Sequence, residues 1–397
     1  MTVERGTAIE RHLLRHADGR RLYVFGDLRG HLRGDLAGHE LPDRPTDEPA
    51  GLHQRYDAVS GSWVAISPAR NTRPHASTVP RGAGSGCPLC PGGPEVPFGY
   101  EAAVFENRFP SFESDPPQPP ALTGAEPSLG RCEVVLYTDR HEGSLATLSP
   151  AELARLIAIW TDRSTDLWSD PRHAAVLIFE NRGTAVGATL SHPHGQIYAF
   201  DRMPPLIQAR VAALREHRAR TGACLGCDLT SDEAGPAAGD EAAASARRVE
   251  PSPAFAVGVP FAPRWPYEIH LRARRHGARR LADLEPGERV ELARTLRRLV
   301  LRYDGLFGFE LPYMMVVHEA PEGAADWHLS FEFFPPHRTA RLPKVRASVE
   351  TATGLFINDT IPEASGRALA AIPVETREEC PPVEIARVGM DEAAAGA

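Results

Sequence analysis

Histidine and glutamine side chains alternate in the segment His192-Pro193-His194-Gly195-Gln196, and this pattern could carry out group transfer. On a β-strand the three polar side chains point to one face in steps of about 6–7 Å. A neutral imidazole at His194 can attack phosphorus and hold the transferred group as a phosphoramidate. An amide at Gln196 can donate a hydrogen bond to a phosphoryl oxygen without transferring a proton, so the intermediate can persist until a second phosphate acceptor binds. We expect Gly195 to let a ligand approach the backbone closely.

A pair of structural histidines beside a turn is the alternative interpretation of this segment. Burying three polar groups on one face without partners is costly, which favours a functional site. Residues 192–200 alternate as a strand does, and residues 174–181 form an apolar run typical of a buried strand. Between the two lies a loop rich in glycine. The sequence therefore predicts that the chemistry lies where these two strands meet.

Further elements are predicted around this pair of strands. Residues 55–67, 102–109 and 132–138 have the alternation and composition of strands. Residues 148–168 carry apolar side chains at helical spacing, with Ser149 as the N-cap and Pro150 at the first helical position. A β-rich beginning followed by a helix and two more strands is expected.

The second half of the chain repeats the first at an almost constant spacing, which indicates an internal duplication. Pro150 matches Pro286 and His192 matches His328 at a spacing of 136 residues, and Arg140-His141 matches Arg275-His276 at 135. At the same spacing His194 becomes Ser330 and Gln196 becomes Glu332. Two copies of one β-α-β unit are predicted, and only the first keeps both central histidines.

Length, composition and charge indicate the general class of protein. A chain of 397 residues allows two or three domains, and 42% hydrophobic with 24% charged residues is an ordinary globular balance. The formal net charge of −8 gives no electrostatic reason to expect nucleic-acid binding. No apolar run is long enough to span a bilayer, and the charged N-terminal residues do not resemble a signal peptide. A cytoplasmic protein without a membrane partner is expected.

Four of the six cysteines form two C-x-x-C pairs, Cys87/Cys90 and Cys224/Cys227. In a reducing compartment such pairs suggest metal binding or redox chemistry, although a simple turn is also compatible with them. We divide the chain into an N-terminal extension (1–52), a first unit (53–205), a second unit (206–380) with an insertion at 228–252, and a tail (381–397).

The segment FENRGTAVGATLSHPHGQIYAF at 179–200 resembles the active-site signature of the galactose-1-phosphate uridylyltransferase family, a branch of the histidine-triad superfamily. The resemblance runs from Arg55 to GLFINDT at 354–360. The implied fold class is α+β, with tandem duplicated histidine-triad-like units, each an antiparallel sheet with packed helices. The implied reaction exchanges UMP between UDP-glucose and galactose 1-phosphate in a ping-pong mechanism, and the implied assembly is a homodimer.

The resemblance also implies roles for individual residues. His194 matches the uridylylated nucleophile and Gln196 the side chain that stabilises the intermediate. Cys87, Cys90, His141 and His192 match a closed zinc site, which is structural in kind. The positions that match substrate-binding residues are Arg70, Arg73, Asn107, Asn181, Gly187, Thr189 and Glu350.

The sequence departs from the family pattern at a second metal site. Some members hold this metal with a glutamate and three histidines, but the matching positions here are Arg210, Ser330 and Glu332, which leaves only His318. Other members use a second C-x-x-C pair with two later histidines. We therefore expect either free thiols at Cys224 and Cys227 or a possible metal site made by these two cysteines with His318.

Two other functions stay open at this point. An adenylyltransferase or nucleotide phosphorylase of the same superfamily shares the HPHGQ motif, which does not choose the base. A zinc-stabilised nucleotide-binding protein that has lost catalysis is the third possibility, and the intact His194 and Gln196 argue against it.

Overall fold

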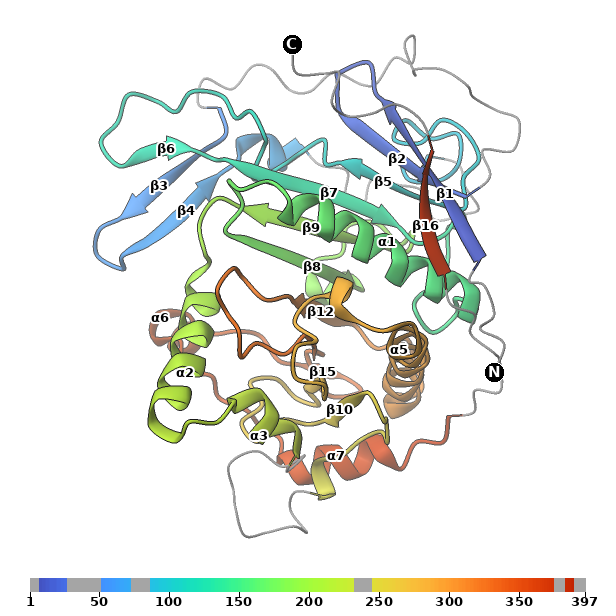
Figure 1. Cartoon of the computed structure of the whole chain (residues 1–397), viewed down its shortest axis with the longest axis vertical. Helices are drawn as coiled ribbons and strands as arrows, with labels where there is room; N and C mark the ends of the chain where they lie inside the picture. Colours follow the sequence, from blue (N-terminus) through green and yellow to red (C-terminus); the bar gives the residue numbers. More distant parts are fainter. Residues whose placement is uncertain (1–6, 27–50, 73–85, 232–244, 375–382, 389–397) are drawn as a thin grey trace.

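Eleven strands form one sheet that runs through the whole molecule (Figure 1). The computed structural model describes residues 7–26, 51–72, 86–231, 245–374 and 383–388. In these residues the order of strands is β10-β11-β13-β12-β8-β9-β7-β5-β2-β1-β16, and all neighbours are antiparallel except β1 and β16. The strands are β1 (Thr7–Arg15), β2 (Arg21–Phe25), β5 (Ala102–Glu106), β7 (Gly130–Leu136), β8 (Ala175–Arg182), β9 (His194–Phe200), β10 (Phe255–Gly258), β11 (Ile269–Ala273), β12 (Tyr313–His318), β13 (Ser330–Phe334) and β16 (Val383–Val388).

The predicted duplication is visible in the strand order. From the central pair β8 and β12, the strands β9, β7 and β5 follow on one side, and β13, β11 and β10 follow on the other. Each half therefore contributes four antiparallel strands in the same order, counted from the middle. Because β8 and β12 pair with each other, the two halves share one sheet, and the α+β duplicated architecture expected from the sequence is the one observed.

Each half contributes one long helix that packs against the sheet. Helix α1 (Pro150–Trp168) begins as predicted, because the Ser149 side chain accepts from the backbone of Glu152 and the Glu152 carboxylate accepts from the backbone of Ser149. Its counterpart α5 (Pro286–Phe307) begins with Pro286 at the matching position. The two helices contact each other, so the duplicated units are joined by helix packing as well as by strand pairing.

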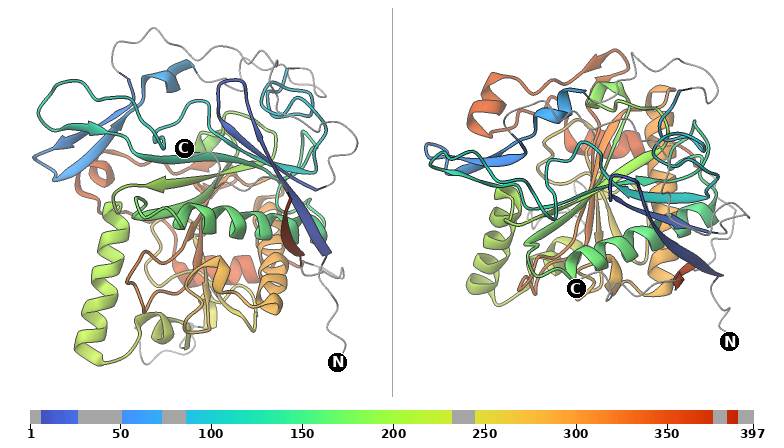
Figure 2. Two further views of the ribbon diagram at one scale, coloured as in Figure 1. Left: turned by 45° about the horizontal axis from the view of Figure 1, so that its top comes forward. Right: turned by 90° about the horizontal axis from the view of Figure 1, so that it is seen from above.

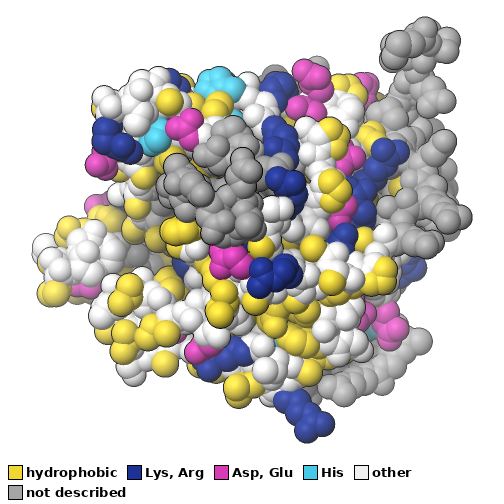
Figure 3. All heavy atoms as spheres, turned by 90° about the horizontal axis from the view of Figure 1, so that it is seen from below, with side chains coloured by type: hydrophobic (Ala, Val, Ile, Leu, Met, Phe, Trp, Pro, Cys, Tyr) yellow, Lys and Arg dark blue, Asp and Glu magenta, His cyan; other side chains and the backbone are white. Residues whose placement is uncertain are grey.

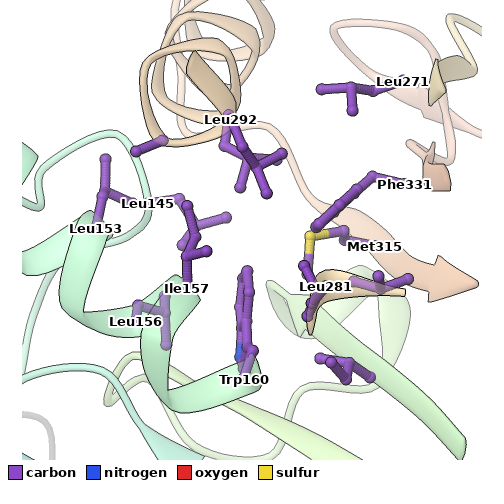
Figure 4. Packing of buried hydrophobic residues seen from close by; sticks show 14 of the residues in the cluster. Leu145, Leu153, Leu156, Ile157, Trp160, Leu271, Leu281, Leu292, Met315 and Phe331 are labelled. Carbon is purple, nitrogen blue, oxygen red and sulfur yellow. The ribbon is translucent and has the colours of Figure 1, made fainter. Parts of the chain in front are cut away.

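One hydrophobic core lies between the sheet and these two helices and is filled by both halves (Figure 4). The first half supplies Leu145, Leu153, Leu156, Ile157 and Trp160, and the second half supplies Leu271, Leu281, Leu292, Met315 and Phe331. The Trp160 ring lies 6.4 Å from the ring of Phe331, measured between centroids. Since neither half buries its apolar face alone, each needs the other to be stable.

The remaining elements lie around this body. A three-stranded sheet in the order β4-β3-β6 stands apart from the main sheet, and its β3–β4 hairpin projects outward (Figure 2). The bounds of these elements are β3 (His53–Asp57), β4 (Ser62–Ile66), β6 (Ala125–Pro127), β14 (His337–Thr339), β15 (Leu342–Pro343), α2 (Pro205–Thr221), α3 (Leu225–Ser231), α6 (Ser348–Thr353), α7 (Pro362–Ala370) and the 3-10 turns η1 (Pro68–Thr72), η2 (Thr184–Val186) and η3 (Leu281–Asp283).

Two segments that the sequence analysis assigned to an N-terminal extension and a tail contribute strands to the main sheet. Strand β1 pairs with β2 on one side and with β16 on the other. The buried Arg11 of β1 reaches Asp162 (2.8 Å) and Asp166 (2.6 Å) on α1. These partners lie about 150 residues away in the sequence. The residues next to Arg11 in the sequence therefore predict an exposed side chain, although the arginine is buried.

The described surface mixes charges of both signs with scattered hydrophobic side chains, as the underside of the molecule shows (Figure 3). Among the described residues, no helix is long and apolar enough to cross a membrane. Part of the predicted insertion at 228–252 is described: α3 includes 228–231 and Arg248 forms a bridge with Gly258, while 232–244 lie outside the described residues.

Candidate active site and metal centres

The nucleophile candidate His194 is the first residue of β9, at a place where strand pairing changes. On the β7 side pairing continues to this residue, since His194 lies opposite Leu136. On the β8 side the last pair is Phe179 with Gln196, so the ladder has already ended when it reaches His194. His194 and Gln196 share one face of β9, as the alternation predicted. The histidine thus stands at an open sheet end, accessible to a ligand.

One nitrogen of His194 is already used by the protein. Its Nδ1 atom lies 2.7 Å from the backbone oxygen of His192, to which a proton on Nδ1 donates. This contact leaves the lone pair of Nε2 available. Burial lowers the pKa of the ring, so the imidazole is neutral near neutral pH. A neutral imidazole whose orientation is set by a hydrogen bond at one nitrogen can attack phosphorus with the other nitrogen.

Gln196 is oriented by a neighbouring amide. The Nδ2 atom of Asn107 donates to Oε1 of Gln196 over 3.4 Å, while Oδ1 of Asn107 accepts from the backbone of Phe109 at 2.8 Å. Because the oxygen of Gln196 accepts this bond, its NH₂ group is left to donate elsewhere. The pair of amides therefore presents a hydrogen-bond donor beside the nucleophile.

Two cavities meet at His194. The smaller, of about 110 Å³, includes Phe105, Phe109 and Val134 along with Gln196, and it is mostly apolar. The larger, of about 240 Å³, is also lined mostly by apolar atoms, but it includes the polar side chains of Asn181, Arg182 and Thr184. His194 lines both cavities. A nucleotide-like group and a second polar group can therefore be held on either side of one imidazole.

The first Cys/His cluster lies directly behind the nucleophile. The ligand atoms of Cys87, Cys90, His141 and His192 all lie within 4.8 Å of one another. Nδ1 of His192 faces the Cys90 sulfur at 3.5 Å, and its Nε2 lies 2.9 Å from the backbone oxygen of Thr138. A cluster ligand thus also supplies the carbonyl that fixes His194. These contacts connect the cluster to His194 through the backbone.

A second Cys/His cluster occupies the equivalent place in the second half. It consists of Cys224, Cys227, His276 and His328, again with all ligand atoms within 4.8 Å. Nε2 of His328 lies 3.5 Å from both sulfur atoms, and its Nδ1 contacts the backbone oxygen of Ala273 at 2.7 Å. The two halves therefore repeat the cluster as well as the strands.

The prediction that His318 would complete this cluster is corrected by the structure. His318 lies on β12 with its Nε2 3.5 Å from Glu332, and burial lowers its pKa. The repeat itself held the missing signal: the cysteine pairs are 137 residues apart, and His276 and His328 follow their counterparts at 135 and 136. The family pattern drew attention to His318, whereas the internal spacing points to the histidines that are found.

Both clusters have donors suited to a tetrahedral metal ion. Each offers two thiols and two imidazoles, the set that zinc prefers in closed sites. Burial raises the pKa of the Cys90 thiol to about 12 and that of Cys227 to about 11, and a bound cation offsets this cost by stabilising the thiolates. Burial also lowers the pKa of His192 to about 4, which keeps its ring free to bind a metal.

The other predicted site residues are brought to different distances from His194. Asn181 follows the Phe179–Gln196 pair by two residues and so lies on the same face of the sheet. Thr189 lines the smaller cavity, and Gly187, with φ of +81°, ends the 3-10 turn between β8 and β9. Asn181 and Thr189 thus each line a cavity that His194 also lines, whereas Gly187 lines neither.

Arg70 and Glu350 are held by other groups. Arg70 donates to the hydroxyls of Ser111 and Tyr198, each at 3.2 Å, and Tyr198 lies on the same face of β9 as His194. Glu350 lines neither cavity, and its carboxylate accepts from Lys344 at 2.6 Å and from the backbone of Ile357 at 3.0 Å. Arg73 lies outside the described residues.

The face in the second half that corresponds to the active site is closed by an ion pair. Arg210 of α2 bonds both oxygens of Glu332 at 2.6 and 2.7 Å, where the first half has Gln196 and an open cavity. Ser330 stands at the position of His194. This half therefore offers no imidazole nucleophile at the equivalent position.

A duplicated antiparallel fold whose first copy places an imidazole beside a Cys/His cluster defines a histidine-triad type of nucleotidyl-transfer protein. Comparisons with known proteins agree. The model of the N-terminal domain of galactose-1-phosphate uridyl transferase matches residues 43–204, and that of the C-terminal domain matches residues 214–350. The chain belongs to the galactose-1-phosphate uridylyltransferase family.

Relatives and solved structures cover most of the chain. A galactose-1-phosphate uridylyltransferase of Thermotoga maritima is 37% identical over 332 residues, which are 82% of this chain and 99% of that protein. One of Streptomyces lividans is 33% identical over 83% of this chain and 89% of that protein. A solved uridylyltransferase structure superposes with a TM-score of 0.71 at 29% identity, over 81% of this chain and 98% of the other. An ADP-glucose phosphorylase of Arabidopsis thaliana, with a TM-score of 0.61 at 22% identity over 81% of this chain and all of the other, shares the fold.

Proposed function

We propose that this protein exchanges UMP between UDP-glucose and galactose 1-phosphate through a covalent uridylyl-His194 intermediate. The observation that carries the proposal is the position of His194 between two cavities, with Nδ1 bonded to the backbone oxygen of His192 and Nε2 left for attack. Membership in the family supplies the substrates, since relatives at 37% and 33% identity are named for this activity.

In the first step the lone pair of Nε2 forms a bond to the α-phosphorus of UDP-glucose, and the bond from that phosphorus to the bridging oxygen breaks. Glucose 1-phosphate leaves with the electron pair, and because it departs as an anion no proton has to be supplied. In the second step a phosphate oxygen of galactose 1-phosphate attacks the same phosphorus and releases His194. The reaction proceeds by two displacements at one nucleophile.

Gln196 stabilises the intermediate in this scheme. With its oxygen held by Asn107, its NH₂ group donates to a non-bridging oxygen of the transferred phosphoryl group. We assign Asn181, Gly187 and Thr189 to the phosphates by their position. The apolar side chains of the smaller cavity are proposed to hold the nucleoside, and the polar side chains Asn181 and Thr184 of the larger cavity the departing and arriving sugar phosphates.

We propose that zinc occupies both Cys/His clusters in a structural role. Zinc would hold the loop at Cys87 and the backbone carbonyl of His192 in place, and the chemistry at His194 needs no metal-bound water. Both clusters require reduced thiols, which supports a reducing, cytoplasmic location.

A homodimer is proposed as the working assembly. Hydrophobic side chains that are half or more exposed gather in one stretch of the chain, namely Leu342, Val345, Val349, Leu355, Ile357 and Ile361. Covering them with a second copy removes this apolar surface from water. Glu350 lies in the same stretch, so a role of this residue toward the hexose is proposed to depend on the dimer.

Mass spectrometry of the intact protein tests the proposed function. Incubation with UDP-glucose and no acceptor is expected to add one uridylyl group to the wild type and none to His194→Ala. Ser330→Ala, altered at the equivalent position of the second half, is the matched control and should still form the adduct. An adenylyl adduct from ADP-glucose alone would instead assign the protein to the phosphorylase-like branch, and no adduct from either donor would refute the covalent mechanism.

A further inference from the structure

A buried carboxyl group lies behind the nucleophile strand and has no part in the mechanism described above. Glu180 of β8 is 5% exposed, and its two oxygens accept from two tyrosine hydroxyls: Tyr137 at 3.0 Å and Tyr313 at 2.9 Å. The tyrosines come from different halves, because Tyr137 follows β7 and Tyr313 begins β12. Glu180 therefore connects both halves at the edge of the larger cavity, which it also lines.

Only one of these two tyrosines touches the nucleophile strand. A Cβ atom added at Gly195 would lie 2.3 Å from the Tyr137 hydroxyl oxygen and 3.0 Å from the backbone oxygen of Phe179. The backbone N–H of Tyr137 also donates to the oxygen of Pro193 at 3.2 Å. Tyr137 thus contacts the chain on both sides of His194. The expectation that Gly195 makes room for a ligand is corrected, since the room is taken by this hydroxyl.

This contact matters because few other bonds hold the strand at that point. Pairing with β8 has ended, and Pro193 has no N–H to donate. The position of Nε2 on His194 thus depends on the His192 carbonyl, the β7 pairing and the Tyr137 contact. A shift of about 1 Å at a reacting atom costs on the order of 10²-fold in rate.

The surroundings of Glu180 suit a fixed hydrogen-bond acceptor. Burial raises the pKa of its carboxyl to about 7, while the two tyrosine hydroxyls and the cation of Arg182 lower it. The guanidinium of Arg182 is itself held by Asp304 of α5 at 2.7 Å, and Glu310 lies 3.6 Å from it. The charged groups facing Glu180 are therefore paired with one another, which leaves the carboxyl to orient the tyrosines.

We propose that Glu180 is a positioning residue that, through the Tyr137 hydroxyl, holds the backbone at Gly195 and so aims Nε2 of His194 at the phosphorus. The inference rests on the proposed covalent mechanism. It predicts that Glu180 and Tyr137 affect the rate of uridylyl transfer and not the affinity for UDP-glucose.

Comparing the two tyrosines tests the proposal. Tyr137→Phe and Tyr313→Phe each remove one buried hydroxyl from Glu180, but only the first removes the contact with Gly195. Single-turnover quench-flow with UDP-glucose is expected to show transfer slowed roughly 10- to 100-fold in Tyr137→Phe and less than about threefold in Tyr313→Phe. UDP-glucose affinity and the melting temperature should change little and to a similar extent in both variants. Equal losses of rate would overturn the proposal in favour of a purely structural role.

A rescue experiment provides the second readout. Gly195→Ala should slow transfer strongly, because the new methyl group collides with the Tyr137 hydroxyl. Adding Tyr137→Phe removes the closest collision and should restore part of the lost rate, so that the double variant is faster than Gly195→Ala alone. A double variant that is slower than either single one would contradict the inference. If the wild type itself forms no adduct, the proposed function fails first, so the two failures are distinguishable.

Discussion

At the scale of single residues, the two halves show how little separates an active position from a silent one. His194 and Gln196 of β9 correspond to Ser330 and Glu332 of β13, on strands that occupy the same place in each half. A serine lacks a basic nitrogen, and the Glu332 carboxylate is neutralised by Arg210. The second half has neither the nucleophile nor the hydrogen-bond donor at these positions, and an ion pair lies there.

Gln196 supplies one hydrogen bond to the phosphoryl group in this account. Gln196→Ala is therefore expected to lower the rate of uridylyl transfer by about 10²-fold, the usual effect of removing one donor from such a site. Asn107→Ala should cost less, because it only loosens the orientation of Gln196. Quench-flow measurement of both variants decides the order, and a larger loss in Asn107→Ala would show that the roles are reversed.

Glu180 predicts a dependence of stability on pH. Its pKa of about 7 in the folded protein exceeds the ordinary value of about 4.3 in an unfolded chain, so the folded state holds the proton more tightly. Its contribution to stability is full below pH 4.3 and is lost as the pH rises through 7, by roughly 4 kcal/mol in total. Glu180→Gln has no such proton to lose.

Melting curves between pH 4.5 and 7.5 check this sign. The melting temperature of the wild type should fall relative to that of Glu180→Gln as the pH rises. A difference that does not change over this range would mean that the carboxyl has the same pKa in both states.

At the scale of elements, the two clusters share one arrangement. In each, a histidine faces a cysteine sulfur with one ring nitrogen and a backbone carbonyl oxygen with the other. In the first half the carbonyl is that of Thr138, and in the second it is that of Ala273. The first cluster also adjoins the nucleophile, whereas the second adjoins the closed face. The two centres should therefore differ in their effect on activity.

Metal analysis with variants separates the two centres. The wild type is expected to bind two zinc ions per chain, and Cys87→Ser and Cys224→Ser should each retain about one. Cys224→Ser should melt at a lower temperature but still form the uridylyl adduct at a similar rate, while Cys87→Ser should slow it because His192 loses its anchor. Slow adduct formation in a folded Cys224→Ser would show that the second centre also positions the site.

The sequence could predict those elements whose signals are local or repeated. The cap at Ser149, the alternation of β9 and the spacing between the halves depend on nearby residues or on a copied pattern, and the structure agrees with them. Glu180 could not be recognised in this way, because its tyrosine partners lie 43 and 133 residues away. Strand β1 was missed for the same reason, since distant carboxylates neutralise its buried arginine.

At the scale of the whole molecule, one sheet and one core join two copies, of which only the first carries the histidine and glutamine of the proposed site. The second copy pairs β12 with β8, completes the core and supplies Tyr313 to the Glu180 cluster. It therefore supports the active copy as a scaffold. The exposed hydrophobic side chains of 342–361 are proposed to be covered in a similar way by a second chain.

Sedimentation velocity tests the proposed homodimer. The wild type should sediment as a dimer, and Val345→Asp, which places a charge on a 72% exposed hydrophobic position, should shift it to the monomer without lowering the melting temperature of the chain itself. Leu122→Asp, at a 53% exposed hydrophobic position outside this stretch, is the matched control and should stay dimeric. A wild type that is monomeric at all concentrations would contradict the assembly.

The central claim is that uridylyl-His194 is an intermediate that passes its UMP to galactose 1-phosphate. The most direct measurement isolates the protein after reaction with UDP-glucose, maps the modified peptide, and then adds galactose 1-phosphate. The account predicts a phosphoramidate on His194 and not on His192, which is stable in buffer and discharged by galactose 1-phosphate with formation of UDP-galactose. An adduct on another residue, or one that water removes as fast as the sugar phosphate does, would contradict it.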